Sequence, residues 1–176
     1  MNLMDASHST LLVIDFQTRL MPAIHEGGAA IANTARLIEA ARLLELPMVT
    51  TEQNPKGLGS TVPAVAGAGP VIEKMSFGAC AQPAFLAAIG TDRDLVVTGC
   101  EAHVCVLQTV IGLLGLGRRV YVVRDAVGSR RAESKETAMA RMAGHGAEIV
   151  TAEMVVFEWL RSADHEKFRA VSTLIR

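Results

Sequence analysis

The sequence predicts an α/β fold, a three-layer, doubly wound, six-stranded parallel sheet with strand order 3-2-1-4-5-6. Short runs of branched apolar residues alternate along the chain with longer segments that carry apolar residues at helical spacing. Such alternation is typical of a parallel sheet covered by helices on both faces. The chain has 176 residues, 50% of them apolar, without an internal linker or repeat. We therefore expect a single domain over residues 1–176.

The N-terminal part of the chain contains three of the predicted strands. A helix over residues 31–46 follows the first of them, and Pro47 should stop that helix. Residues 53–70 are rich in glycine and proline, and a loop of this length favours a functional role. The strands are short, mostly apolar runs and are predicted at residues 11–14, 48–51 and 71–74.

The rest of the chain continues the alternation. A glycine-rich run at 112–117 suits the C-terminal cap of one helix, and Ser134 and Gly146 are expected to bound another. The remaining elements show strand or helix patterns in turn and are helix 82–89, strand 95–98, helix 106–114, strand 119–123, helix 134–145, strand 148–151, and terminal helices 154–160 and 165–174.

Charge and motif content exclude several classes of function. The net charge is −1 at pH 7 and the charged residues are interspersed, so neither nucleic acid nor a membrane is an indicated partner. No apolar run approaches the roughly 20 residues of a membrane span, and the N-terminus lacks a secretory pattern. Three cysteines in such a chain predict reduced thiols and a cytoplasmic protein. The motifs of dinucleotide-binding loops, phosphate-binding loops and serine nucleophile elbows do not occur.

Cys105 is the first candidate for a functional residue. It ends the segment 99–105, where a predicted strand gives way to a helix of mostly apolar residues. The free N–H groups and the dipole of a helix start favour an anion. A thiol there should therefore lose its proton more readily than the unperturbed pKa of about 8.5 implies. The alternative is a small buried hydrophobe, which is what most cysteines are.

Charged residues at two other strand ends strengthen the catalytic interpretation. Asp15 directly follows the strand at 11–14, and Lys74 ends the strand at 71–74. Such positions face the ligand crevice of an open parallel sheet. Taken singly, Asp15 could be a helix N-cap and Lys74 an exposed charge. Together with Cys105 they supply the acid/base, the cation and the thiol that a cysteine amidase needs.

Over roughly residues 8–174 the chain resembles the isochorismatase-like cysteine hydrolases, a family that includes the nicotinamidases. Segment 51–59 is similar to the isochorismatase-domain-containing subgroup, whose substrates are mostly unassigned. Pairs at 108–109, 125–126 and 129–130 add support. Three motifs carry the resemblance and are specific when they occur together: Leu-Val-Ile-Asp-Phe-Gln at 12–17, Glu-Lys at 73–74 with Ser-Phe at 76–77, and Gly-Cys-Glu-Ala-His-Val-Cys at 99–105.

This resemblance implies a role for each central residue. It makes Asp15 the general base, Lys74 the cationic partner and Cys105 the nucleophile. It also implies a cis peptide bond between Cys100 and Glu101. The backbone N–H groups of Glu101 and Cys105 would then form the oxyanion hole, where each donor typically contributes about 3–4 kcal/mol. Family members are usually dimers or tetramers, so the resemblance implies a homo-oligomer.

Five further residues adjoin the strand ends and are candidates for the substrate pocket, with packing as an equal alternative: Phe16, Gln17, Asn54, Phe77 and His103. A histidine in a strand-to-helix turn more often satisfies backbone groups than it lines a pocket. Nicotinamidases bind a divalent ion through aspartate and histidine in the loop after the second strand. Residues 52–56 contain neither, so we expect no metal and no other cofactor.

These residues together predict a hydrolase that cleaves a small amide through a thioester. Two alternatives stay open. Hydrolysis of the vinyl ether of isochorismate proceeds by protonation from the aspartate and needs no thiol, so Cys105 counts against it. The other is a non-catalytic or redox-sensing thiol protein on the same fold.

Overall fold

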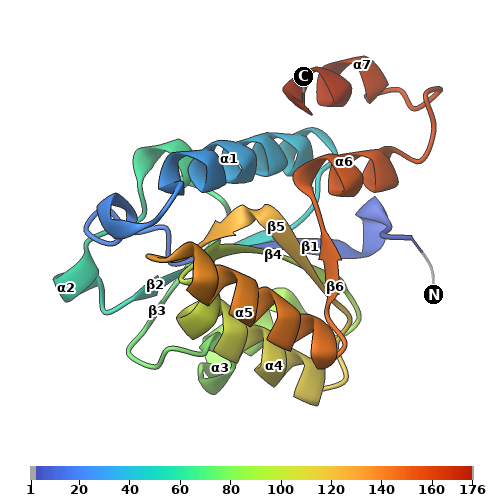
Figure 1. Cartoon of the computed structure of the whole chain (residues 1–176). Coiled ribbons are helices and arrows are strands. Elements are labelled where there is room, and N and C mark those ends of the chain that lie inside the picture. The colour runs from blue at the N-terminus through green and yellow to red at the C-terminus, as the bar shows by residue number, and fades with distance from the viewer. Residues whose placement is uncertain (1–2, 176) are drawn as a thin grey trace.

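The computed structural model describes residues 3–175, and a six-stranded sheet lies at its centre (Figure 1). The strands are β1 (Ser9–Ile14), β2 (Met48–Gln53), β3 (Val71–Lys74), β4 (Asp94–Cys100), β5 (Val120–Gly128) and β6 (Glu148–Val150). Their order is β3-β2-β1-β4-β5-β6, and every neighbouring pair is parallel. The predicted fold class and strand order are confirmed.

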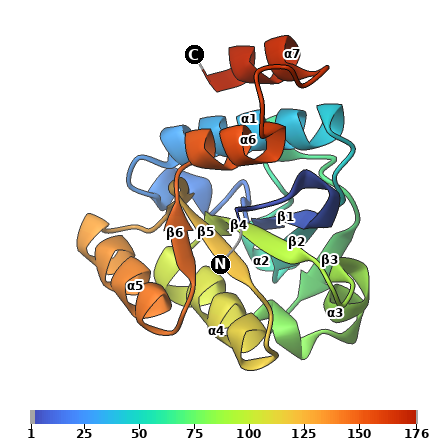
Figure 2. The ribbon, with the colours of Figure 1, turned by 90° about the vertical axis from the view of Figure 1, so that its right-hand side faces the viewer.

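Helices cover both faces of this sheet. They are α1 (Gly27–Leu43), α2 (Pro55–Leu58), α3 (Pro83–Ile89), α4 (Leu107–Gly115), α5 (Ala132–Gly144), α6 (Ala152–Leu160) and α7 (Phe168–Ser172). Helices α1 and α6 lie on one face and α3, α4 and α5 on the other, while α7 lies outside α1 and α6 (Figures 1 and 2). No helix within residues 3–175 is long and apolar enough to cross a membrane.

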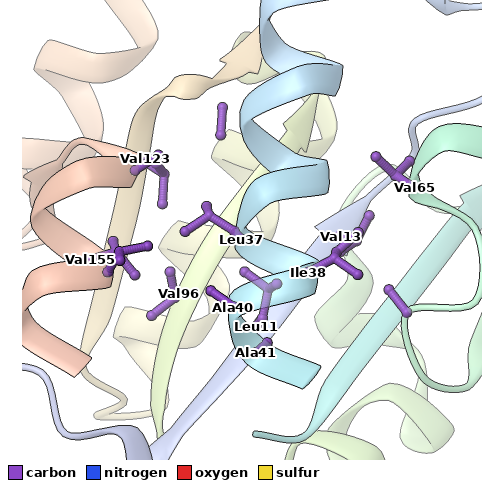
Figure 3. Packing of buried hydrophobic residues seen from close by; sticks show 14 of the residues in the cluster. Leu11, Val13, Leu37, Ile38, Ala40, Ala41, Val65, Val96, Val123 and Val155 are labelled. Atoms are coloured by element: carbon purple, nitrogen blue, oxygen red, sulfur yellow. The ribbon is translucent and has the colours of Figure 1, made fainter. Parts of the chain in front are cut away.

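Strand β1 shows how the sheet is buried on both faces. Leu11 and Val13 belong to the core cluster on the α1 side, whereas Leu12 and Ile14 belong to the cluster on the opposite side. Because side chains alternate between the two faces of a strand, one continuous apolar run contributes to two cores. Figure 3 shows Leu37 of α1 in the first cluster, together with Leu11 and Val13.

Two helix ends differ from the prediction for local reasons. Glu45 adopts a left-handed φ of 59°, a conformation that commonly ends a helix, so α1 stops before Pro47 is reached. The predicted Ser134 cap was wrong, because α5 already begins at Ala132. Its N-cap is Arg131, which makes no side-chain capping bond.

The connection between β2 and β3 is anchored to the end of β1. Gln17 and Thr61 form an antiparallel bridge, and the Glu52 carboxylate accepts hydrogen bonds of 2.7 Å from both the N–H and the hydroxyl of Thr61. The side-chain amide of Gln17 donates to the carbonyls of Gln53 at 3.0 Å and Gly59 at 2.7 Å. It also accepts from the Gln53 N–H at 2.8 Å. The start of this connection is therefore fixed beside Asp15.

We expect Leu37→Ala to lower the free energy of unfolding by about 2–5 kcal/mol, because it leaves a cavity between α1 and the sheet. Urea denaturation followed by circular dichroism measures the change. Leu116→Ala is the matched control, since Leu116 is 57% exposed while Leu37 is 0% exposed. The control should change stability by no more than about 0.5 kcal/mol. Equal losses in the two variants would contradict this description of the core.

Candidate active site

Three of the predicted residues meet at the carboxyl edge of the sheet. Asp15 directly follows β1, Lys74 is the last residue of β3, and Cys105 lies in a turn of π-helix, Ala102–Val106, between β4 and α4. The Lys74 Nζ atom lies 2.7 Å from the Asp15 Oδ2 atom. The Asp15 carboxylate also acts on the Cys105 thiol, because its charge and a hydrogen bond from the thiol both raise the pKa of that thiol. Three segments that are distant in sequence thus place a carboxylate and a cation in contact, close enough to a thiol to change its pKa.

The Asp15 carboxylate is held at both oxygens. Its Oδ1 atom accepts a hydrogen bond of 2.6 Å from the Thr51 hydroxyl, and Oδ2 accepts from the Lys74 ammonium. The backbone of Asp15 has a left-handed φ of 52°, which aspartate tolerates better than branched residues do. Its N–H donates to the Thr51 carbonyl at 3.1 Å. Strand β2 therefore fixes the orientation of Asp15 together with β1.

The Lys74 ammonium has three hydrogen-bond acceptors around it. Besides Asp15 at 2.7 Å, the carbonyl oxygens of Phe77 and Ser76 accept from Nζ at 2.9 Å and 3.3 Å. The side chains of Lys74 and Asp15 are both 0% exposed. A buried ion pair is stable only when hydrogen bonds replace the water that each charge has lost. The segment after β3 supplies those hydrogen bonds through its backbone.

Cys105 is buried, and its surroundings disfavour the thiolate. Burial is the main cause that raises the pKa of Cys105 to about 12, and the negative charge and hydrogen bond of Asp15 raise it further, while Lys74 lowers it. The expected depression of this pKa by the helix start is therefore wrong, because burial and the neighbouring carboxylate outweigh it. At neutral pH Cys105 therefore rests as a thiol, which needs a base in order to react.

The turn before Cys105 is clamped to the loop after β5. The peptide bond between Cys100 and Glu101 is cis. The Glu101 carboxylate accepts a hydrogen bond of 3.0 Å from the Arg130 N–H and bonds of 2.8–3.1 Å from the Arg130 guanidinium. Burial opposes the charge on Glu101, but the bonds from Arg130 outweigh it, so the pKa of Glu101 is lowered. The Glu101 side chain thus has a structural partner, which the sequence did not indicate.

The five candidate pocket residues have different surroundings. Phe16 is 0% exposed and packs in the core on the α1 side, and Gln17 is 0% exposed and anchors the connection after β2. Packing therefore accounts for the position of the Phe16 side chain, and anchoring of the connection accounts for that of Gln17. Phe77 is 52% exposed, and the Asn54 N–H donates to the Lys74 carbonyl at 2.8 Å. His103 Nδ1 lies 3.0 Å from the Ser129 hydroxyl, so its partner is a side chain rather than the backbone.

Sequence reasoning missed Thr51. The signal was present in principle, because Thr51 ends the second predicted strand and Asp15 follows the first. The register pairs Ile14 with Thr51, which puts the threonine hydroxyl beside Asp15, the residue that follows β1. That register cannot be read from one strand alone. Only the pairing of the two strands makes Thr51 part of the site.

Two further features describe the surroundings of the site. Within residues 3–175, no group of three or more His, Cys, Asp or Glu side chains comes together in a way that could hold a metal ion. A cleft of about 320 Å³ includes Lys74 in its lining, and its other lining residues are Pro55, Glu73, Met75 and Gln82.

Comparison with known proteins supports a common ancestry over most of the chain. A model of the isochorismatase domain matches residues 9–154. Isochorismatase domain-containing protein 1 of Danio rerio is 38% identical over 172 residues. That alignment covers 96% of this chain but only 61% of the relative, so the chain spans about three fifths of the relative's length.

Solved structures agree with this result. A structure described as the MAR1 ribonuclease of Caenorhabditis elegans is 37% identical, with a TM-score of 0.94 over 98% of this chain and 92% of that one. YcaC from Pseudomonas aeruginosa, solved with hexane-2,5-diol and covalent acrylamide, is 25% identical, with a TM-score of 0.87 over 98% and 95% of the two chains. The family model and these similarities together show that the chain belongs to the isochorismatase family.

Proposed function

We propose that this protein is a cysteine-dependent hydrolase of a small amide, with Asp15, Lys74 and Cys105 as its catalytic residues. Membership of the isochorismatase family supports a hydrolase in general. The amide substrate is part of the proposal. One observation carries the proposal: a single buried carboxylate, Asp15, lies 2.7 Å from the Lys74 ammonium and raises the pKa of the Cys105 thiol through its charge and a hydrogen bond. This is the arrangement of a nucleophile, its base and a charge that orients the base.

In the first step, Asp15 takes the thiol proton as the Cys105 sulfur attacks the carbonyl carbon of the amide. A C–S bond forms, and the π electrons of the carbonyl move onto oxygen. The raised pKa of Cys105 means that the thiolate arises only as the proton moves to Asp15. The Lys74 ammonium supplies positive charge next to the sulfur at that moment. The backbone N–H groups of Glu101 and Cys105 would hold the oxyanion.

In the second step, the oxyanion collapses and the C–N bond breaks, while protonated Asp15 gives its proton to the leaving nitrogen. An acyl group remains on Cys105 as a thioester. Water then attacks this thioester, Asp15 accepts the proton from water, and the C–S bond breaks. The acid product leaves, and the thiol regains its proton from Asp15. No cofactor is needed for this cycle.

Two observations weigh against the alternative functions. Isochorismate carries two carboxylates, yet two cations beside the site are engaged, Lys74 by Asp15 and Arg130 by Glu101. A redox-sensing cysteine needs an accessible thiolate. Cys105 is 6% exposed and its pKa is raised to about 12. Amide hydrolysis uses both the thiol and the carboxylate, and we therefore prefer it.

A ribonuclease activity is not part of this proposal, although one similar structure is described as a ribonuclease. Proteins that bind RNA usually neutralise phosphates with clustered lysine and arginine residues. The net charge of this chain is −1, and its charged residues are interspersed. We propose a small-molecule substrate instead, a cytoplasmic location and a homo-oligomeric state. The exposed apolar side chains of Leu3, Met154 and Phe157, which line one groove, support an oligomer.

We expect Cys105→Ala and Asp15→Asn each to abolish turnover, because one removes the nucleophile and the other its base. Ammonia release from a panel of small primary amides measures turnover, and circular dichroism checks the fold. Asp94→Asn is the matched control and should keep its activity, since Asp94 is also a buried, ion-paired aspartate but lies at the start of β4, at the opposite end of the strand from the site. Full activity in either of the first two variants would refute the mechanism.

Labelling with acrylamide separates the two roles of Asp15. The charge of Asp15 raises the pKa of Cys105, so Asp15→Asn should lower that pKa and increase the thiolate population at pH 8. We expect the variant to be alkylated at Cys105 at least about tenfold faster than the wild type, one pKa unit being a factor of ten. Peptide mapping by mass spectrometry measures the rates. Slower labelling of the variant would contradict the described electrostatics.

Thr51→Val should reduce kcat by about 10–100-fold, because a hydrogen bond to a charged group contributes roughly 1.5–3 kcal/mol. Thr50→Val is the matched control. Thr50 is the preceding residue of β2, equally buried, and its hydroxyl donates to the Ala68 carbonyl at 2.7 Å, away from Asp15. Steady-state kinetics on an amide that the wild type hydrolyses compares the two. Equal effects on kcat would mean that Thr51 only stabilises the fold.

A further inference from the structure

We propose that Thr109 is a positioning residue that fixes the Lys74 ammonium relative to the Cys105 sulfur. The inference rests on the proposed function, because it assumes that Cys105 is the reacting residue. Thr109 lies in the first turn of α4 and is 0% exposed. The Thr109 hydroxyl makes no hydrogen bond to the Lys74 ammonium or to the Cys105 thiol. Its effect is transmitted through the backbone on either side.

The Thr109 hydroxyl makes two hydrogen bonds with different segments. It donates to the Cys105 carbonyl at 2.7 Å and accepts from the Ala79 N–H at 3.0 Å. A helical threonine that bonds to the carbonyl four residues earlier is common and purely local. The second bond is not local, because Ala79 belongs to the segment after β3. One hydroxyl thus joins that segment to the backbone of the nucleophile.

The segment joined in this way is the one that holds Lys74. The carbonyl oxygens of Ser76 and Phe77 accept hydrogen bonds from the Lys74 Nζ atom, and the Ser76 hydroxyl donates to the Gly78 carbonyl at 2.9 Å. Ala79 follows directly. A shift of this segment away from α4 would therefore carry the two carbonyl acceptors, and with them the ammonium, away from Cys105.

Close packing on both sides of Ala79 shows that the segment and α4 are docked tightly. A Cβ atom at Gly78 would lie 3.4 Å from the Gln108 side chain. A Cβ atom at Gly112 would lie 2.9 Å from the Cys80 sulfur, closer than real contacts allow. The Cys80 thiol also lies 3.5 Å from the Thr109 carbonyl oxygen. The bond between Thr109 and Ala79 lies at the centre of this contact.

The test compares three variants by the rate of acrylamide labelling at Cys105 and by kcat on an amide that the wild type hydrolyses. Thr109→Val keeps the shape of the side chain but removes both hydrogen bonds of the hydroxyl. We expect the labelling rate and kcat each to fall at least about tenfold, because the variant loses the free energy of one hydrogen bond or more. Thr109→Ser keeps the hydroxyl and should stay within about threefold of the wild type. Thermal unfolding is measured for every variant.

Thr34→Val is the matched control. Thr34 is also a helical threonine that is 0% exposed, and its hydroxyl bonds to the Ala126 carbonyl at 3.5 Å on the other face of the sheet. It should lower the unfolding temperature without changing the labelling rate. If Thr109→Val behaves like Thr34→Val, Thr109 is merely structural and the inference fails.

A second variant keeps the test decisive if Thr109→Val does not fold. Thr109→Ala removes the same hydroxyl without placing a methyl group against the Ala79 N–H and the Cys105 carbonyl. It should slow labelling as Thr109→Val does, and wild-type labelling rates would overturn the inference. If the wild type hydrolyses no amide but these variants still label slowly, the proposed function fails and the positioning role stands.

Discussion

The buried ion pair between Lys74 and Asp15 is the interaction on which the rest of the site depends. Strands β1 and β3 are separated by β2, so their axes lie about 10 Å apart, two strand spacings. The long side chain of Lys74 crosses the end of β2 to reach Asp15, and Thr51 of β2 bonds to the same carboxylate. Two buried charges that have lost their hydration water need several hydrogen-bond partners to replace it. The strand order and the register of β2 therefore determine whether the pair can exist.

Burial is the main reason why the Cys105 thiol is not a resting thiolate, and the same ion pair adds to that effect. The Lys74 cation lowers the pKa of Cys105, but the Asp15 carboxylate that is paired with this cation raises that pKa by more. The site is thus nearly neutral, and its reactivity depends on proton transfer between two groups in contact. A reagent that needs a preformed thiolate meets a poor nucleophile. In the proposed mechanism, a substrate whose carbonyl lies within reach of the sulfur meets a base, Asp15, that is already aligned.

Much of the fold and the centre of the site could be predicted from the sequence, because apolar runs and strand ends are local signals. The apolar run before Asp15 predicts both a buried strand and a residue at the crevice. Other features depend on contacts between distant segments. The turn at Glu45 replaces the expected stop at Pro47, and the bonds of Glu101 to Arg130 join two loops. Burial of Cys105 reverses the expected effect of the helix start on its pKa.

The anchoring of the connection after β2 has a consequence for how a protein of this fold could acquire new specificity. Gln17, Glu52 and Thr61 hold the base of that connection, whereas Lys56 and Gly57 at its tip are exposed. Insertions or exchanges at the tip would remodel the approach to the crevice without disturbing the carboxylate beneath it. Mutation of the tip, natural or designed, can therefore change which molecules reach the crevice while the side chains at its base keep their positions.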